Sequence, residues 1–318
     1  MIGNDLKKAV KLLKNNDLVA IPTETVYGLA ANALSTEAIV KIFEVKNRPF
    51  FDPLIIHIDH FKKMEIYARN IPEKILFLAA SLSPGPITFL LERKAIIPDL
   101  ITAGSPLVAI RIPNHPLTLD LLSNLPFPLA APSANPFGYI SPTSAQHVAQ
   151  QLGEEIPYIL DGGTCSVGVE STIIGYENNQ ATIYRKGGIS IEKIESLIGS
   201  VQVKEHSTSN PKSPGQLKSH YAPRVPFKLG DLPSLIDAHQ GERLAVLSFD
   251  KAIKHASIQK QLVLSPKSSL SEAAQNLFAY MRLLDQEDVD VILAEKVPNM
   301  ELGKAINDRL MRAAADYI

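Results

Sequence analysis

Short apolar runs alternate with helical periodicities along residues 1–200. Residues 4–15 place apolar side chains at helical spacing with lysines between them, which predicts an amphipathic helix. The apolar runs at 18–21 and 54–58 lack that period and predict buried strands. Further strands are predicted at 87–91, 107–112, 127–131, 157–160, 171–176 and 181–185, and helices at 36–48, from 72, and at 115–123, 143–152 and 190–198.

The predicted strands outnumber the predicted helices, and short loops join several neighbours, so a mixed sheet with flanking helices is expected. From 243 the pattern changes to strands at 244–249 and 289–294 that alternate with helices at 271–285 and 303–315. Such alternation predicts a small parallel, Rossmann-like α/β domain.

The stretch 201–226 separates the two patterns and is polar and rich in proline at its centre. We therefore expect an α/β protein with a catalytic domain at 1–200, a connecting segment at 201–226 and a C-terminal α/β domain at 227–318.

Composition narrows the class of protein. A chain of 318 residues is long for one core, and 45% hydrophobic with 20% charged residues is typical of globular proteins. The 32 basic and 33 acidic residues show no basic excess of the kind that neutralises nucleic-acid phosphates. A single cysteine, Cys165, excludes an internal disulfide. With neither an apolar leader nor a long apolar run, we expect a cytoplasmic location.

Polar groups follow the strand at 18–21. The stretch 22–29 contains two threonines, a glutamate, a tyrosine and a glycine, and open α/β sheets bind ligands at strand ends. Thr25 is the candidate ligand-binding side chain. The alternative is an ordinary strand-to-helix loop whose hydroxyls cap the helix.

Two cations lie next to Pro49. Proline disfavours α geometry in the residue before it, and in an extended backbone Lys46 and Arg48 would point the same way. A guanidinium fork beside an ammonium suits a phosphate. The alternative is that both cations complement the C-terminus of the preceding helix.

The segment 132–136 brackets Ser133 and Asn135 with prolines, which presents one hydroxyl and one amide with little conformational freedom. A plain proline turn is the alternative. Downstream, Ser141 and Thr143 are candidate caps of the next helix.

Two polar side chains interrupt apolar strands. Burying Arg111 is costly unless an anion meets it, and the alternative is an arginine on a solvated face. His57 is placed in the same way, and its alternative is a histidine satisfied within the core.

The glycine-rich stretch 161–172 has the glycine spacing of a P-loop but carries Val169 and Glu170 where Lys and Ser or Thr are required, so a P-loop is rejected. Its glycines still allow backbone amides to approach a phosphate. Nothing places a base beside Cys165, so we do not expect a cysteine nucleophile. No metal-ligand motif is present, and no protein metal ligand is predicted.

Taken together, these blocks resemble the YrdC-type threonylcarbamoyl-adenylate synthases, in their longer two-domain branch. The resemblance covers nearly the whole chain and rests on the shared order of 22–29, 46–49 with 53–54, 83–86, 108–113, 132–136, 161–163 with 170–172, 185–187 and 213–224. It implies a nucleotidyltransferase that forms threonylcarbamoyl-AMP and pyrophosphate from L-threonine, bicarbonate and ATP with Mg²⁺.

The resemblance also implies roles for individual residues. The expected threonine pocket comprises Thr25, His57, Arg111 and Ser171, with Arg111 on the carboxylate. The expected ATP site comprises Lys46, Arg48, Asp52, Leu107, Ala131, Ser133, Asn135, Ser141, Arg185 and Tyr221, and Lys46 and Arg48 are the expected catalytic groups. Asp52 stands where the family more often has asparagine, and its carboxylate would either repel phosphate or help to hold magnesium.

We further expect residues 213–224 to form a lid that places Tyr221 over the nucleotide. Separate proteins would transfer the threonylcarbamoyl group to tRNA, with little or no tRNA contact by this chain. Three alternatives remain: a relative that uses carbamoyl phosphate, a non-catalytic RNA-binding module, and an ATP-binding regulatory protein.

Overall fold

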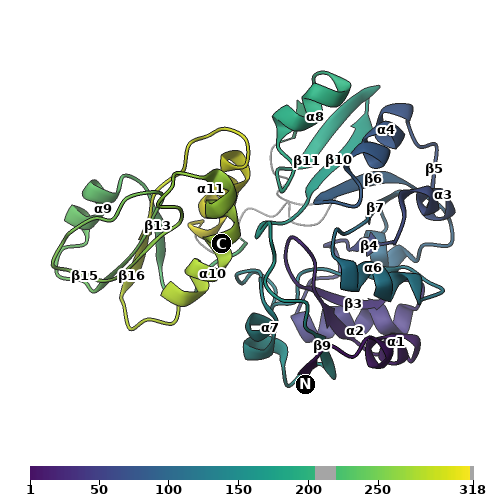
Figure 1. Cartoon of the computed structure of the whole chain (residues 1–318), viewed down its shortest axis with the longest axis horizontal. Coiled ribbons are helices and arrows are strands. Elements are labelled where there is room, and N and C mark those ends of the chain that lie inside the picture. Colours follow the sequence, from purple (N-terminus) through teal and green to yellow (C-terminus); the bar gives the residue numbers. More distant parts are fainter. Residues whose placement is uncertain (205–219, 316–318) are drawn as a thin grey trace. The chain divides into compact units, whose positions relative to one another are not determined.

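The computed structural model of the chain describes residues 1–204 and 220–315, which divide into two compact units (Figure 1). Unit 1 comprises Met1–Phe137, Ser141–Ser166 and Glu170–Leu217. Unit 2 comprises Gly138–Ile140, Val167–Val169 and Lys218–Ile318. Two short segments that interrupt unit 1 in the sequence therefore belong to unit 2.

Unit 1 is built on one twelve-stranded sheet. Its strands are β1 (Ile2–Gly3), β2 (Val19–Ile21), β3 (Gly28–Asn32), β4 (Ile55–His57), β5 (Ala68–Arg69), β6 (Ile87–Arg93), β7 (Leu107–Arg111), β8 (Leu129–Ala130), β9 (Tyr158–Leu160), β10 (Thr172–Glu177), β11 (Gln180–Arg185) and β12 (Gln202–Val203). Its helices are α1 (Leu6–Lys14), α2 (Thr36–Lys46), η1 (Phe61–Lys63), α3 (Met64–Tyr67), α4 (Glu73–Leu82), α5 (Asp99–Thr102), α6 (Pro116–Ser123), α7 (Ala145–Leu152) and α8 (Ile191–Ile198).

The sheet is mixed, as the sequence predicts. Its strands lie in the order β1-β9-β2-β3-β8-β4-β7-β6-β10-β11-β12, with β5 paired to β6. Strand β4 pairs parallel with β7 and antiparallel with β8, and β6 pairs antiparallel with β7 and parallel with β10. This order places β4 between β8 and β7, although long connections separate these strands in sequence.

Side-chain oxygens mark where several helices begin. Asp5 accepts a hydrogen bond from the Lys8 amide at the start of α1, and Ser35 caps α2 in the same way, through the Ala38 amide. The cap predicted for α7 is wrong. Ser144 caps that helix through the His147 amide, because the helix begins at Ala145, two residues later than predicted.

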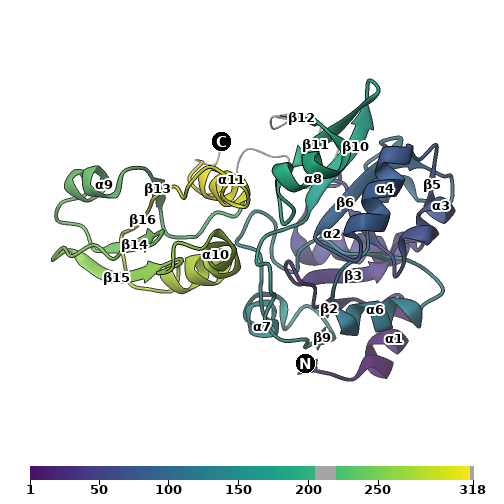
Figure 2. The ribbon, with the colours of Figure 1, turned by 45° about the horizontal axis from the view of Figure 1, so that its top comes forward.

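Three apolar clusters show how the sheet is covered. The largest joins one sheet face to α2, α4, α5, α7 and α8. The second packs α1 and α6, which lie side by side in Figures 1 and 2, on the opposite face at β2, β3 and β9. The third consists of strand residues alone, namely Ile55, Leu90, Ala109, Ile173 and Tyr184, with Leu107 packed against them. Among the described residues, no helix contributes to this cluster on the face of β4, β7 and β6.

Unit 2 contains the predicted small parallel sheet, in the order β13-β16-β14-β15. Its elements are β13 (Phe227–Leu229), α9 (Leu232–Ala238), β14 (Leu244–Ser248), β15 (Ile258–Val263), α10 (Leu270–Leu284), β16 (Val291–Ala294) and α11 (Gly303–Ala313). Ser269 caps α10 through the Glu272 amide. The sequence analysis missed β13, α9 and β15, of which β15 has no fully buried residue to mark it.

Strand β3 shows that the strand-to-helix interpretation of 22–29 is wrong. The loop that follows β2 leads into a strand that pairs antiparallel with β2, through Val19 opposite Ala30 and Ile21 opposite Gly28. The small residues of β3 carry no strong strand propensity, so its pairing depends on neighbours that are distant in sequence.

Candidate functional site

Three of the predicted motifs meet at one place in unit 1. The Lys46 Nζ at the end of α2 donates to the backbone carbonyl of Ser133 at 2.5 Å and to that of Asn135. In the same loop, the Ala134 amide donates to the Tyr27 carbonyl at 2.8 Å. Stretches 22–29, 46–49 and 132–136 are therefore hydrogen-bonded to one another.

Lys46 reaches this position for a different reason from the one the sequence indicates. It is the last residue of α2, and Asn47 caps the helix in a left-handed conformation at φ 50°, so 46–48 is not an extended run. The Lys46 side chain is 1% exposed. Burial, and secondly the nearby Arg48 charge, lower the pKa of Lys46 well below its usual value.

Arg48 has its own anionic partner. One guanidinium nitrogen lies 2.8 Å from the Asp52 carboxylate, and the same nitrogen donates to the Pro53 carbonyl at 2.8 Å. Both side chains are buried, and the guanidinium also lies 5.8 Å from the centre of the Phe137 ring. The Asp52 carboxylate is thus directed at Arg48.

Polar side chains from the adjacent strands β4, β7 and β6 lie in a row across the sheet, on the face that carries the third apolar cluster. His57 of β4 and Thr88 of β6 are the register partners of Arg111 of β7. Each lies two positions from a member of that cluster, and alternate strand residues share a face. The Thr88 hydroxyl lies 2.7 Å from that of Ser171, and Arg185 donates to the Ser171 hydroxyl at 3.0 Å.

His57 is neutral in this row. Burial, and secondly the Arg111 charge, lower the pKa of His57 to about 3. The expected threonine-pocket residues His57, Arg111 and Ser171 are therefore neighbours, and Thr88 joins them although the sequence analysis did not select it. The sequence feature that could have identified Thr88 is its hydroxyl within the otherwise apolar predicted strand 87–91.

Glu24 is the second residue that the sequence analysis missed. Its carboxylate lies 2.9 Å from a guanidinium nitrogen of Arg111, and both residues are 4% exposed. Arg111 is therefore not an arginine on a solvated face. Thr25, next in the chain, is fully buried, and its hydroxyl lies 2.8 Å from that of Thr23. The sequence feature that could have identified Glu24 is its position between two threonines in the loop that begins at Pro22.

The remaining members of the expected ATP site lie at several points of unit 1. The Ser141 hydroxyl donates to the Glu170 carboxylate at 2.7 Å, and the Ala131 amide donates to the Ile55 carbonyl at 3.0 Å. Leu107 begins β7 four residues before Arg111, which separates the two by about 13 Å along the strand.

Tyr221 belongs to unit 2. Its ring stacks on Phe278 at 5.3 Å between centroids, and the Arg312 guanidinium lies 4.8 Å from the ring centre. Residues 213–219 of the expected lid lie outside the described residues. The closure of Tyr221 over a nucleotide stays a prediction.

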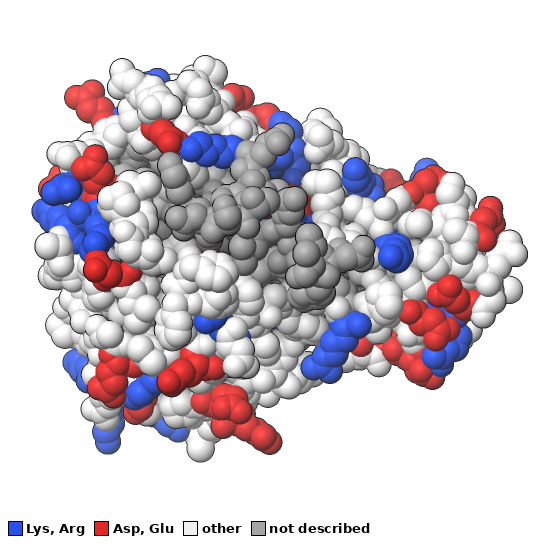
Figure 3. Space-filling model, turned by 180° about the vertical axis from the view of Figure 1, so that it is seen from behind, with Lys and Arg blue, Asp and Glu red and all other residues white. Residues whose placement is uncertain are grey.

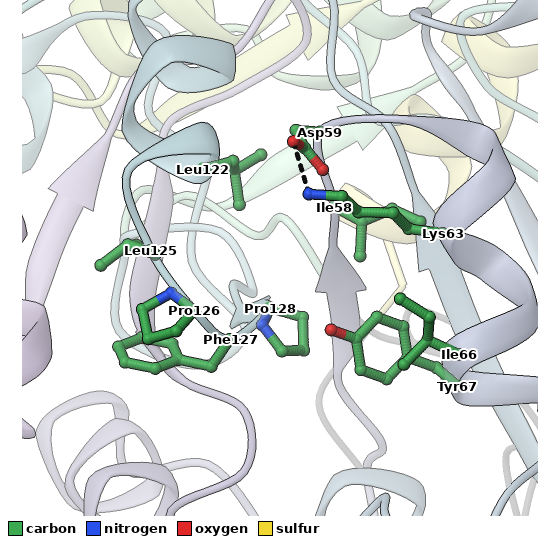
Figure 4. A pocket seen from close by; sticks show the side chains of 10 residues that line it. All are labelled: Ile58, Asp59, Lys63, Ile66, Tyr67, Leu122, Leu125, Pro126, Phe127 and Pro128. Atoms are coloured by element: carbon green, nitrogen blue, oxygen red, sulfur yellow. Dashed lines mark hydrogen bonds and ion pairs between the residues drawn. The ribbon is translucent and has the colours of Figure 1, made fainter.

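A separate pocket of about 160 Å³ in unit 1 contains none of the expected site residues (Figure 4). Its lining is mainly apolar, with the Asp59–Lys63 ion pair at 2.8 Å as its charged feature. It comprises Ile58, Asp59, Lys63, Ile66, Tyr67, Leu122, Leu125, Pro126, Phe127 and Pro128. A pocket with one neutralised cation has little to offer a triphosphate.

Within residues 1–204 and 220–315, no three histidine, cysteine or acidic side chains are grouped so as to hold a metal ion. In the same ranges no helix has the length and apolar content needed to cross a membrane. On the face drawn in Figure 3, basic and acidic side chains are interspersed, in keeping with the balanced charge.

Two family models together match most of this chain. Residues 11–187 match the Sua5/YciO/YrdC family model, described as "Telomere recombination", and residues 189–315 match the threonylcarbamoyl-AMP synthase C-terminal domain. The threonylcarbamoyl-AMP synthase of Bacillus subtilis is 40% identical, covering 98% of this chain and 94% of that protein. That of Pyrococcus abyssi is 38% identical, covering 97% and 94%.

The crystal structure of P. abyssi Sua5 complexed with L-threonine superposes with a TM-score of 0.93 at 37% identity, over 99% of this chain and 97% of that one. The two matched domains follow one another in this chain with a single residue between them. The chain therefore belongs to the Sua5/YciO/YrdC family, in the two-domain form that carries the Sua5 C-terminal domain.

Proposed function

We propose that this protein is an L-threonylcarbamoyladenylate synthase, a nucleotidyltransferase that joins L-threonine, bicarbonate and ATP into threonylcarbamoyl-AMP and releases pyrophosphate. The observation that carries the proposal is the similarity, over nearly the full length of both chains, to relatives named threonylcarbamoyl-AMP synthase. The hydrogen-bonded meeting of stretches 22–29, 46–49 and 132–136 supports it. A carbamoyl-phosphate-using enzyme and a non-catalytic RNA-binding module are less well supported, because neither matches those names.

The row on β4, β7 and β6 is the proposed threonine end of the site. Arg111 is the partner of the substrate carboxylate, because a guanidinium forms charge-assisted hydrogen bonds with that group. Neutral His57 and the hydroxyls of Thr25 and Ser171 supply hydrogen bonds to the rest of the amino acid.

Lys46 and Arg48 are the proposed contacts of the triphosphate, supported by the Ser133, Asn135, Ser141 and Arg185 side chains and by backbone at Leu107 and Ala131. We propose that Asp52 acts through Arg48, whose guanidinium it holds at 2.8 Å. Tyr221 is the proposed cover of the nucleotide.

The chemistry requires two anions to come together. The threonine amine attacks the carbon of bicarbonate, water is lost, and a carbamate forms. A carbamate oxygen then attacks the α-phosphorus of ATP, and the bond to pyrophosphate breaks. Cations aimed at the phosphates lower the repulsion and stabilise charge on the leaving group.

Mg²⁺ is proposed to arrive with ATP. The described residues contain no cluster of metal ligands, and the Asp52 carboxylate is directed at Arg48. Magnesium commonly retains water and phosphate oxygens as ligands in such sites. It would neutralise charge on the triphosphate when bound.

The product is proposed to pass to a separate tRNA-modifying transferase in the cytoplasm. The balanced charge of the chain supports a small-molecule product over tRNA as the ligand.

The test is pyrophosphate release from ATP with threonine or bicarbonate omitted in turn, and with carbamoyl phosphate offered in their place. We expect release to require both co-substrates and to fall at least about 100-fold in Arg111→Ala and in Lys46→Ala. Arg69→Ala is the matched control, because Arg69 is an exposed arginine paired with Glu92 at 3.4 Å. Release without threonine would contradict the proposed reaction, and full activity in both site variants would contradict the site.

A further inference from the structure

The ion pair of Glu24 and Arg111 has unused hydrogen-bonding capacity. Within the described residues, neither Glu24 carboxylate oxygen accepts a hydrogen bond, and the Nε and Nη2 of Arg111 donate none. The two groups are held 2.9 Å apart as an ion pair, and both side chains are buried.

Such an arrangement is costly in a folded protein. Buried polar atoms nearly always have hydrogen-bond partners, and a buried ion pair repays its desolvation only when its remaining lone pairs and protons are satisfied. Each buried group without a hydrogen-bond partner needs an explanation, and a ligand that pairs with it supplies one.

The charge pattern of the pair matches one class of ligand. An α-amino acid carries an ammonium and a carboxylate on one carbon, so its two charges are as close together as those of Glu24 and Arg111. The other titratable groups beside the pair do not compete for the charges of the ligand. Burial lowers the pKa of His57 to about 3 and raises that of Cys165 to about 12, so both are neutral.

We propose that Glu24 is a substrate-binding residue that receives the α-ammonium of threonine while Arg111 receives the carboxylate. This inference rests on the proposed function, since it assigns a new contact in the same site. Glu24 is then a specificity residue, because a ligand without a charged amine cannot pair with the Glu24 carboxylate.

The experiment compares two ligands on the wild-type protein and on Glu24→Gln. L-Threonine carries both charges, whereas 3-hydroxybutanoate has the same carbon skeleton and hydroxyl without the amine. Glutamine keeps an oxygen that can face Arg111 but removes the negative charge. We expect Glu24→Gln to weaken threonine binding by roughly 10- to 100-fold, as for other hydrogen bonds to charged groups, and 3-hydroxybutanoate binding by less than about twofold.

Calorimetric binding without ATP is the readout, with 3-hydroxybutanoate measured by competition. Glu92→Gln, which alters the exposed pair with Arg69, is the control and leaves both affinities unchanged. Equal weakening of both ligands would mean that Glu24 only positions Arg111, and unchanged threonine binding would also overturn the proposal.

Wild-type protein alone provides a second measurement if the variant does not fold. It should prefer threonine to 3-hydroxybutanoate by about the same roughly 10- to 100-fold factor, and equal affinities would overturn the proposal. Binding is measured without turnover, so a protein that binds threonine through Glu24 but releases no pyrophosphate would contradict the proposed function and leave this inference standing.

Discussion

Replacing Lys46 with methionine tests the electrostatics of the site through stability. The Lys46 nitrogen is buried against the Ser133 and Asn135 carbonyls, and burial lowers its pKa well below the usual 10.5. A neutral amine still has two N–H groups, one for each carbonyl. Lys46→Met keeps an unbranched side chain, one atom shorter, that has nothing to titrate.

The sign of the pH effect follows from proton binding. Between the lowered pKa of the folded state and the unfolded value of 10.5, the unfolded chain binds more protons at Lys46 than the folded protein does. The contribution of Lys46 to the free energy of unfolding therefore rises with pH in that window and reaches its maximum above pH 10.5. The slope is at most about 1.4 kcal/mol per pH unit.

The assay is urea unfolding of both proteins at about pH 8, 9 and 10, followed by circular dichroism. We expect the unfolding free energy of wild type minus that of Lys46→Met to increase by about 1 kcal/mol per pH unit. Lys41→Met is the control for losing a lysine from the same helix, because the Lys41 side chain is 35% exposed. A stability difference for Lys46→Met that does not change with pH would refute the reasoning that Lys46 is buried against those carbonyls.

Two further predictions concern other parts of the site. Because burial lowers the pKa of His57 from 6.5 to about 3, the folded protein resists its protonation, and stability should fall as the pH drops from 6.5 toward 3, by up to about 5 kcal/mol. Urea unfolding of His57→Gln should lack this contribution, and an identical pH dependence in both proteins would contradict it. Gly187→Ala should destabilise by about 1–3 kcal/mol, because a Cβ there would lie 2.3 Å from the Glu170 carbonyl oxygen. Gly163→Ala, which meets nothing within 4 Å but has a left-handed φ of 81°, separates this steric cost from backbone strain, and equal thermal unfolding shifts in the two variants would argue against the clash.

Local patterns in the sequence were enough to predict much of the fold. Apolar runs identified β4, β6, β7 and most of their neighbours, and helical spacing identified α1, α2 and α10, because these elements bury one face or both against a core. The mixed sheet and the small parallel sheet followed from how strands and helices alternate. Strand β3 could not be found in this way, since its small residues gain their strand structure from β2 and β8.

For the site, the sequence by itself determined which chemical groups are available and in what order they occur: the threonine loop, the paired cations, the proline-bracketed serine and the strand arginine. Only the tertiary structure decided which of them meet. It placed Glu24 on Arg111, aligned His57 and Thr88 with Arg111 across three strands, and directed Lys46 to the Ser133 carbonyl. The physical reason is that a buried charge takes its partner from whatever the sheet order brings within a few ångströms, and sheet order depends on pairings between strands far apart in the chain.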